Sequence, residues 1–86
     1  MTNSLMIEGT VKDINTDLFG VSGFTLLTEL RKAEYNFLIT CSDYARHRCK
    51  DNLKPDIHVM IIGSVTDKGI YADNVYFQHW GEDEGK

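Results

Sequence analysis

The chain has 86 residues, 42% of them hydrophobic and 26% charged, and a formal net charge of −4. This length predicts one small domain, and no apolar run approaches the ~20 residues that a membrane helix needs. The start, MTNSLMIEGT, lacks a basic segment followed by an apolar one, so we expect no signal peptide and a cytoplasmic protein. Residues 1–80 carry eight basic and ten acidic side chains, a balance that argues against indiscriminate binding to duplex DNA.

Alternation of apolar and polar residues predicts five strands, at 5–14, 24–30, 35–41, 57–66 and 70–77. Gly9 lies inside the first of them and predicts a bulge or a sharp bend. The segment 15–23 contains two glycines and is expected to be a loop that carries Leu18 and Phe19. Shorter turns are expected at 31–34 and 67–69.

The segment 42–53 loses the alternation and has helical spacing instead. Ser42 or Asp43 is expected to cap this helix, and Pro55 follows its end. Two parallel stripes run along it, one apolar (Ala45, Cys49, Leu53) and one basic (Arg46, Lys50, Lys54). The basic stripe is interpreted as a solvated face, with a surface for phosphates or for an acidic partner as the alternative.

The order of elements is therefore three strands, one helix and two strands. This order is typical of an all-β fold in which five strands form a small closed barrel, with the helix between strands three and four. It is the arrangement of the oligonucleotide/oligosaccharide-binding (OB) fold. We assign the OB domain to residues 1–80 and a short acidic tail to residues 81–86. An open α+β sheet with the helix on one face is the alternative.

Three stretches, LMIEGTV, GFTLLT and the run that begins EYNFLITC, resemble the bacterial single-stranded DNA-binding proteins. The start of the chain also resembles a dimeric relative, the primosomal replication protein. The resemblance implies an OB fold that binds single strands and works as a homodimer or a larger homo-oligomer. The sequence departs from the family where a long hairpin is reduced to DKG, where Tyr35 replaces a tryptophan, and where Thr40 or Cys41 replaces a second aromatic.

Single strands bind such barrels by stacking bases on aromatic rings beside basic side chains. The candidate stacking residues are Tyr35, Phe37, Tyr71 and Trp80, and the candidate phosphate-binding residues are Lys12, Arg31, Lys32 and Lys68. Alternation places Tyr35 and Phe37 on the more apolar face of their strand, which is the expected core face. The resemblance would instead place both rings on the binding surface, so the sequence leaves the two interpretations open.

Cys41, His47 and Cys49 give the spacing C-x5-H-x-C, which lacks the fourth ligand of a typical zinc site. The two cysteines are therefore interpreted as buried, reduced and structural, with no metal. The sequence contains no glycine-rich phosphate loop, nucleophile elbow or oriented Cys/His pair, so we expect no enzyme and no cofactor.

The sequence thus predicts a non-catalytic protein that binds single-stranded DNA, or in second place RNA, during replication or recombination, with replication proteins as further partners. The alternative is a protein–protein interaction module of the same fold. Such a module would be an accessory subunit of a replication or mobile-element complex and would not bind nucleic acid itself.

Overall fold

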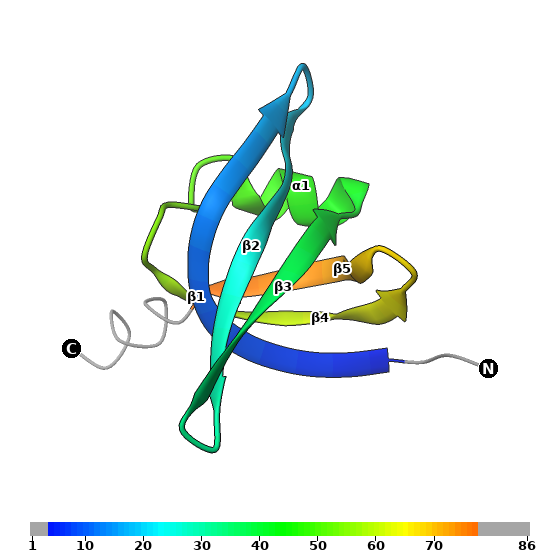
Figure 1. Ribbon diagram of the computed structural model, residues 1–86. Coiled ribbons are helices and arrows are strands. Elements are labelled where there is room, and N and C mark those ends of the chain that lie inside the picture. The colour runs from blue at the N-terminus through cyan, green and yellow to red at the C-terminus, as the bar shows by residue number, and fades with distance from the viewer. Residues whose placement is uncertain (1–3, 78–86) are drawn as a thin grey trace.

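Five strands and one short helix lie within residues 4–77, which are the residues that the computed structural model describes (Figure 1). The elements are β1 (Ser4–Asp17), β2 (Gly20–Leu30), β3 (Ala33–Cys41), α1 (Asp43–Cys49), β4 (His58–Thr66) and β5 (Gly69–Phe77). Their order confirms the predicted succession of three strands, a helix and two strands. The described residues include no helix that is long and apolar enough to cross a membrane.

The sheet closes into a ring in the order β1-β2-β3-β5-β4, because β1 pairs with β2 and also with β4. All of these pairs are antiparallel except β3 with β5, which run parallel and pair over only three residues, Ile39–Cys41 beside Ile70–Ala72. The open α+β sheet is therefore wrong, and the mostly-β closed ring is confirmed.

Strand β1 is shared between both sides of the ring and curves strongly around it (Figure 1). Its residues 4–10 pair with β4 and its residues 10–17 pair with β2. Gly9 lies at this crossing, and a Cβ atom placed on it would overlap the carbonyl oxygen of Leu27. The glycine therefore permits a close approach of two backbones. The register shifts of β1 against β2 come later, between Lys12 and Asn15 and between Asn15 and Thr16, and Asp13 in the first of them has a φ of 43°.

The expected loop at 15–23 is wrong. Strand β1 continues to Asp17 and β2 begins at Gly20, so that only Leu18 and Phe19 form the turn. Gly20 has a φ of 110°, a conformation that a glycine adopts without strain, and the Asp17 carboxylate accepts a hydrogen bond from the Phe19 amide. These two features close a tight hairpin that extends beyond the ring.

Helix α1 is shorter than the predicted 42–53 and packs against β5, β2 and β3 at one end of the ring. Ser42 caps it as predicted, since its hydroxyl accepts a hydrogen bond from the Ala45 amide at 3.1 Å. Ala45 and Cys49 are buried, and Leu53 packs against the core from the turns that follow the helix. The apolar stripe was thus predicted correctly, but only part of it is helical.

Replacing Ser42 by alanine is expected to lower the free energy of unfolding by about 1–2 kcal/mol, because the Ala45 amide loses its cap. The Ser42 hydroxyl also donates to the Asp73 carbonyl at 3.2 Å, so the variant weakens the link between α1 and β5 as well. Urea denaturation measures this loss. The matched control is Ser4→Ala, at an exposed position in β1, which is expected to stay within about 0.5 kcal/mol of the wild type. Equal stability of the two variants would contradict the capping role.

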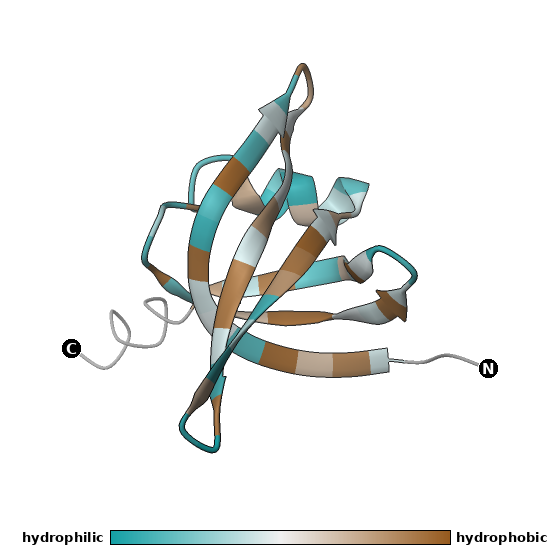
Figure 2. Cartoon of the chain, viewed as in Figure 1, coloured by the Kyte–Doolittle hydropathy of each residue, from teal (hydrophilic) through white to brown (hydrophobic). Residues whose placement is uncertain are grey.

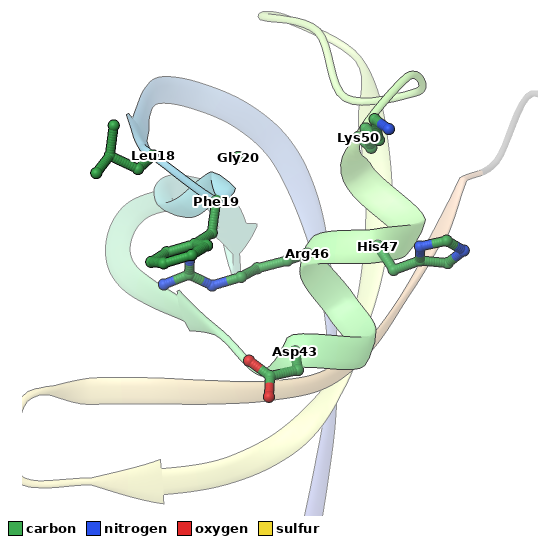
Figure 3. A pocket seen from close by; sticks show the side chains of 7 residues that line it. All are labelled: Leu18, Phe19, Gly20, Asp43, Arg46, His47 and Lys50. Atoms are coloured by element: carbon green, nitrogen blue, oxygen red, sulfur yellow. The ribbon is translucent and has the colours of Figure 1, made fainter.

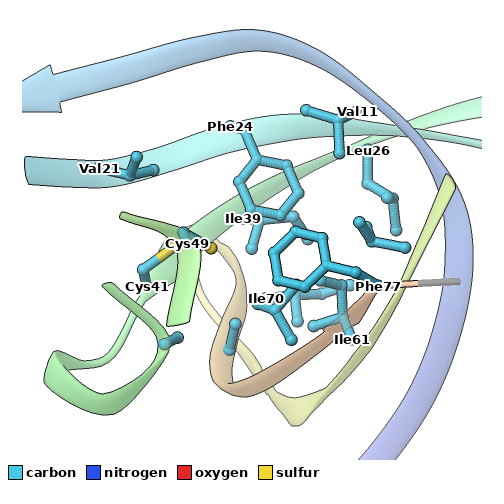
Figure 4. Close-up of a cluster of buried hydrophobic side chains, with 14 residues drawn as sticks. Val11, Val21, Phe24, Leu26, Ile39, Cys41, Cys49, Ile61, Ile70 and Phe77 are labelled. Atoms are coloured by element: carbon cyan, nitrogen blue, oxygen red, sulfur yellow. The ribbon is translucent and has the colours of Figure 1, made fainter. Parts of the chain in front are cut away.

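The core fills the interior of the ring, and the rings of Phe24 and Phe77 lie near its centre (Figure 4). Buried residues come from every element, which explains why hydrophobic and hydrophilic positions alternate along the strands (Figure 2). Cys41 and Cys49 are buried in this cluster as free thiols, as the sequence predicted. The adjacent Cys41 sulfur and burial raise the pKa of the Cys49 thiol.

Candidate nucleic-acid interface

One outer surface of the ring is formed by β2, β3 and the start of β5. Thr25 pairs with Leu38, and Thr40 pairs with Tyr71 across the parallel ladder. The neighbours of these residues along each strand are buried, or half-buried in the case of Phe37, so these side chains point outward. Leu38 is 49% exposed and Tyr71 is 38% exposed. We call this surface the β2–β3–β5 face, and its residues are Thr25, Leu27, Asn36, Leu38, Thr40 and Tyr71.

None of the six residues of the β2–β3–β5 face carries a carboxylate, although the whole chain has a net charge of −4. Acidic residues bound the face at its ends: Glu29 and Glu34 pair across the β2–β3 hairpin, and Asp73 follows Tyr71 by two positions. Glu8, Glu29 and Glu34 line a hollow beside Leu27, so a polyanion would meet less repulsion around Leu38 and Thr40 than at the Leu27 end of the face.

Two of the predicted cations, Lys12 and Lys68, flank the face. Lys12 pairs with Thr25 on the β1 side, and its ammonium group hydrogen-bonds the Asp56 carboxylate, which raises the pKa of Lys12. Lys68 lies in the β4–β5 turn, directly before Gly69, whose backbone packs against Leu38. Lys68 takes part in no ion pair within residues 4–77, so its charge is less compensated than that of Lys12.

Tyr35 and Tyr71 lie on opposite faces of the sheet, so the structure does not bring them together. Tyr35 pairs with the buried Thr28 and shares its face with Phe37 and Ile39. It is nevertheless 47% exposed, because this part of the β2–β3 hairpin extends past the ring. Phe37, two residues further on, is half-buried and packs against the core. Alternation therefore predicted the inner face correctly for both rings.

The remaining predicted site residues lie away from the β2–β3–β5 face or outside the described residues. Arg31 and Lys32 form the turn of the β2–β3 hairpin, both with positive φ, at the end farthest from α1 (Figure 1). They are exposed and lie between Glu29 and Glu34 in the sequence. Trp80 and the acidic tail at 81–86 lie outside the described residues.

Sequence reasoning did not select Leu38, the most exposed apolar side chain of this face. The alternation of the strand does predict an outward Leu38, because its neighbour Ile39 points inward. The contact between Leu38 and the β4–β5 turn had no such signal, since it depends on how β3 and β5 pair to close the ring.

A second surface lies at the tip of the β1–β2 hairpin, beside α1 (Figure 3). Leu18 and Phe19 occupy this tip and are 97% and 82% exposed. The Arg46 guanidinium donates to both carboxylate oxygens of Asp17, at 2.9 and 3.0 Å, and joins the hairpin to the helix. This guanidinium, together with the Phe19 amide, lowers the pKa of Asp17. Arg46 is thus an ion-pairing residue, which the prediction of a solvated stripe did not include.

The three residues of the C-x5-H-x-C pattern do not converge. Cys41 and Cys49 are buried in the core, whereas His47 lines the hollow between α1 and the β1–β2 tip. No cluster of three His, Cys, Asp or Glu side chains that would hold a metal ion occurs within residues 4–77.

No protein-family model matches the chain, and a search of curated proteins finds no significant match to it.

Proposed function

We propose that this chain is an OB-fold protein that binds single-stranded nucleic acid, with DNA as the favoured ligand, and that it carries out no catalysis. The strand order, the parallel β3–β5 pair and the helix between β3 and β4 support this assignment. In this architecture, oligonucleotides bind across strands two and three. The β2–β3–β5 face occupies the corresponding part of the ring.

The observation that carries the proposal is an outward ring and an outward leucine on a face whose six residues carry no carboxylate, although acidic residues lie at its ends. A base can stack on the exposed ring of Tyr71, and the exposed side chain of Leu38 can make apolar contact beside it. Lys68 and Lys12 supply positive charge on two sides. Because the Lys12 ammonium is already paired with Asp56, a phosphate there must compete with that carboxylate. One face holds a single stacking tyrosine, so we also propose that two or more copies act on one strand.

Titration with an oligo-dT strand tests this function through the quenching of the protein's intrinsic fluorescence. Quenching is expected at low salt, since stacking brings a base against Tyr71. Two phosphate contacts give a slope of about −1.4 in log K against log salt, so raising salt from about 50 to about 200 mM is expected to weaken binding by about 7-fold. An affinity that is independent of salt would exclude the phosphate contacts.

A protein-interaction module of the same fold is the second candidate, and the exposure of Leu18 and Phe19 favours it. Large apolar side chains that are almost fully exposed on a fixed hairpin tip are common at sites of protein contact. Absence of any quenching by oligo-dT at low salt, with micromolar protein, would favour this candidate over the first.

A further inference from the structure

The tip of the β1–β2 hairpin and one side of α1 together form a hollow that the nucleic-acid proposal does not use (Figure 3). We call it the tip–helix groove, and its lining residues are Leu18, Phe19, Gly20, Asp43, Arg46, His47 and Lys50. The turn at the hairpin tip is hydrophobic, whereas the helix side of the groove is polar and mostly basic (Figure 2). The groove therefore combines apolar contact area with charge.

The groove is held in place before any ligand arrives. Asp17 accepts hydrogen bonds from the Phe19 amide, at 2.8 Å, and from the Arg46 guanidinium. These bonds fix the apolar tip relative to the helix, so that a ligand does not have to order the hairpin on binding. Preorganisation of this kind increases affinity because it reduces the entropic cost of association.

Charge indicates which ligand fits the groove. Asp17 compensates Arg46, while Lys50 and His47, both exposed, are in no ion pair within residues 4–77. Asp43 lies at the opposite end of α1 from Lys50 (Figure 3). The end of the groove near Lys50 therefore attracts carboxylates, and the end near Asp43 repels them. A continuous polyphosphate would meet both Asp43 and Asp17, which disfavours a nucleic acid here.

We propose that the tip–helix groove binds a peptide segment of a partner protein that presents a bulky apolar side chain next to carboxylates. The apolar side chain packs between Leu18 and Phe19, and the carboxylates lie near Lys50 and His47. This site is separate from the β2–β3–β5 face, so the proposal does not depend on the binding of nucleic acid.

Selection of binders to the wild-type protein from a displayed library of random dodecapeptides tests the proposal. Peptides that carry an aromatic residue or leucine beside Asp or Glu are expected to be enriched. A labelled synthetic copy of the best peptide is then titrated. Phe19→Ser is expected to weaken its binding at least about 30-fold, as for a central interface residue. Lys50→Glu is expected to weaken it about 10-fold, through repulsion of the carboxylates.

The matched control is Met6→Ser, which removes an exposed apolar side chain from another part of the surface and is expected to bind the peptide like the wild type. The proposal would be overturned if the selection enriched no peptides, or enriched peptides without carboxylates. It would also be overturned if the best peptide bound equally well to Phe19→Ser, or if oligo-dT displaced it. Titration of the Phe19→Ser protein with oligo-dT distinguishes the two sites. The β2–β3–β5 face of this variant is expected to bind oligo-dT with the affinity of the wild type.

Discussion

Replacing Tyr71 by alanine is expected to weaken the binding of oligo-dT by about 5- to 150-fold, because a stacked base contributes about 1–3 kcal/mol. The Tyr71 ring points away from the core, between the buried Ile70 and Ala72, so the variant is expected to fold normally. Fluorescence anisotropy of a labelled strand at low salt measures the loss. Tyr71→Phe keeps the aromatic face and is expected to restore most of the affinity.

The sharpest control for this prediction is Tyr35→Ala. Tyr35 is more exposed than Tyr71, but it lies on the opposite face of the sheet, on the hairpin that extends past the ring. Its removal is expected to leave the affinity for oligo-dT close to that of the wild type. Equal losses in both variants would show that the β2–β3–β5 face is not the site, and so would an unchanged affinity of the Tyr71 variant.

Replacing Gly63 by alanine is expected to have the largest effect on stability, a loss of about 3 kcal/mol or more. A Cβ atom at this position would overlap the carbonyl oxygen of Tyr71 on the neighbouring strand, and it would lie 3.0 Å from the Cα atom of Ala72. Both are backbone atoms, so the added methyl group can be accommodated only if β4 and β5 move apart. The free energy of unfolding of a small domain is only a few times larger than this loss.

Urea denaturation, followed by far-UV circular dichroism, measures the loss at Gly63. The control is Ser64→Ala in the same strand, where the half-buried side chain lies on the outer face and the change is expected to cost less than about 0.5 kcal/mol. A Gly63→Ala protein with the stability of this control would contradict the close pairing of β4 with β5.

The fold was predictable wherever one face of a strand is buried. Alternation predicts β5 to within one residue and β3 to within two, because the buried Ile39 and Cys41 of β3, and Ile70 and Ala72 of β5, alternate with exposed positions. The same signal is missing from the β1–β2 hairpin beyond the ring, where residues 15–17 are exposed on both sides. Polar residues and glycines there predict a loop, although backbone pairing makes them strands.

The candidate site was less predictable, because it depends on closure of the ring. Tyr35 and Tyr71 both looked like half-exposed rings, and only the register places them on opposite faces. The ion pair between Asp17 and Arg46 joins residues 29 positions apart, so local sequence patterns carried no signal for it. Leu38, in contrast, could have been selected from alternation alone.

Backbone amide chemical shifts, recorded by NMR while oligo-dT is added at low salt, test the central claim most directly. The β2–β3–β5 face is expected to respond, with the largest changes at Leu38, Thr40, Tyr71 and the adjacent Lys68, while Phe19 and Lys50 keep their shifts. An unchanged spectrum, or changes confined to the tip–helix groove, would contradict the binding of single strands on this face.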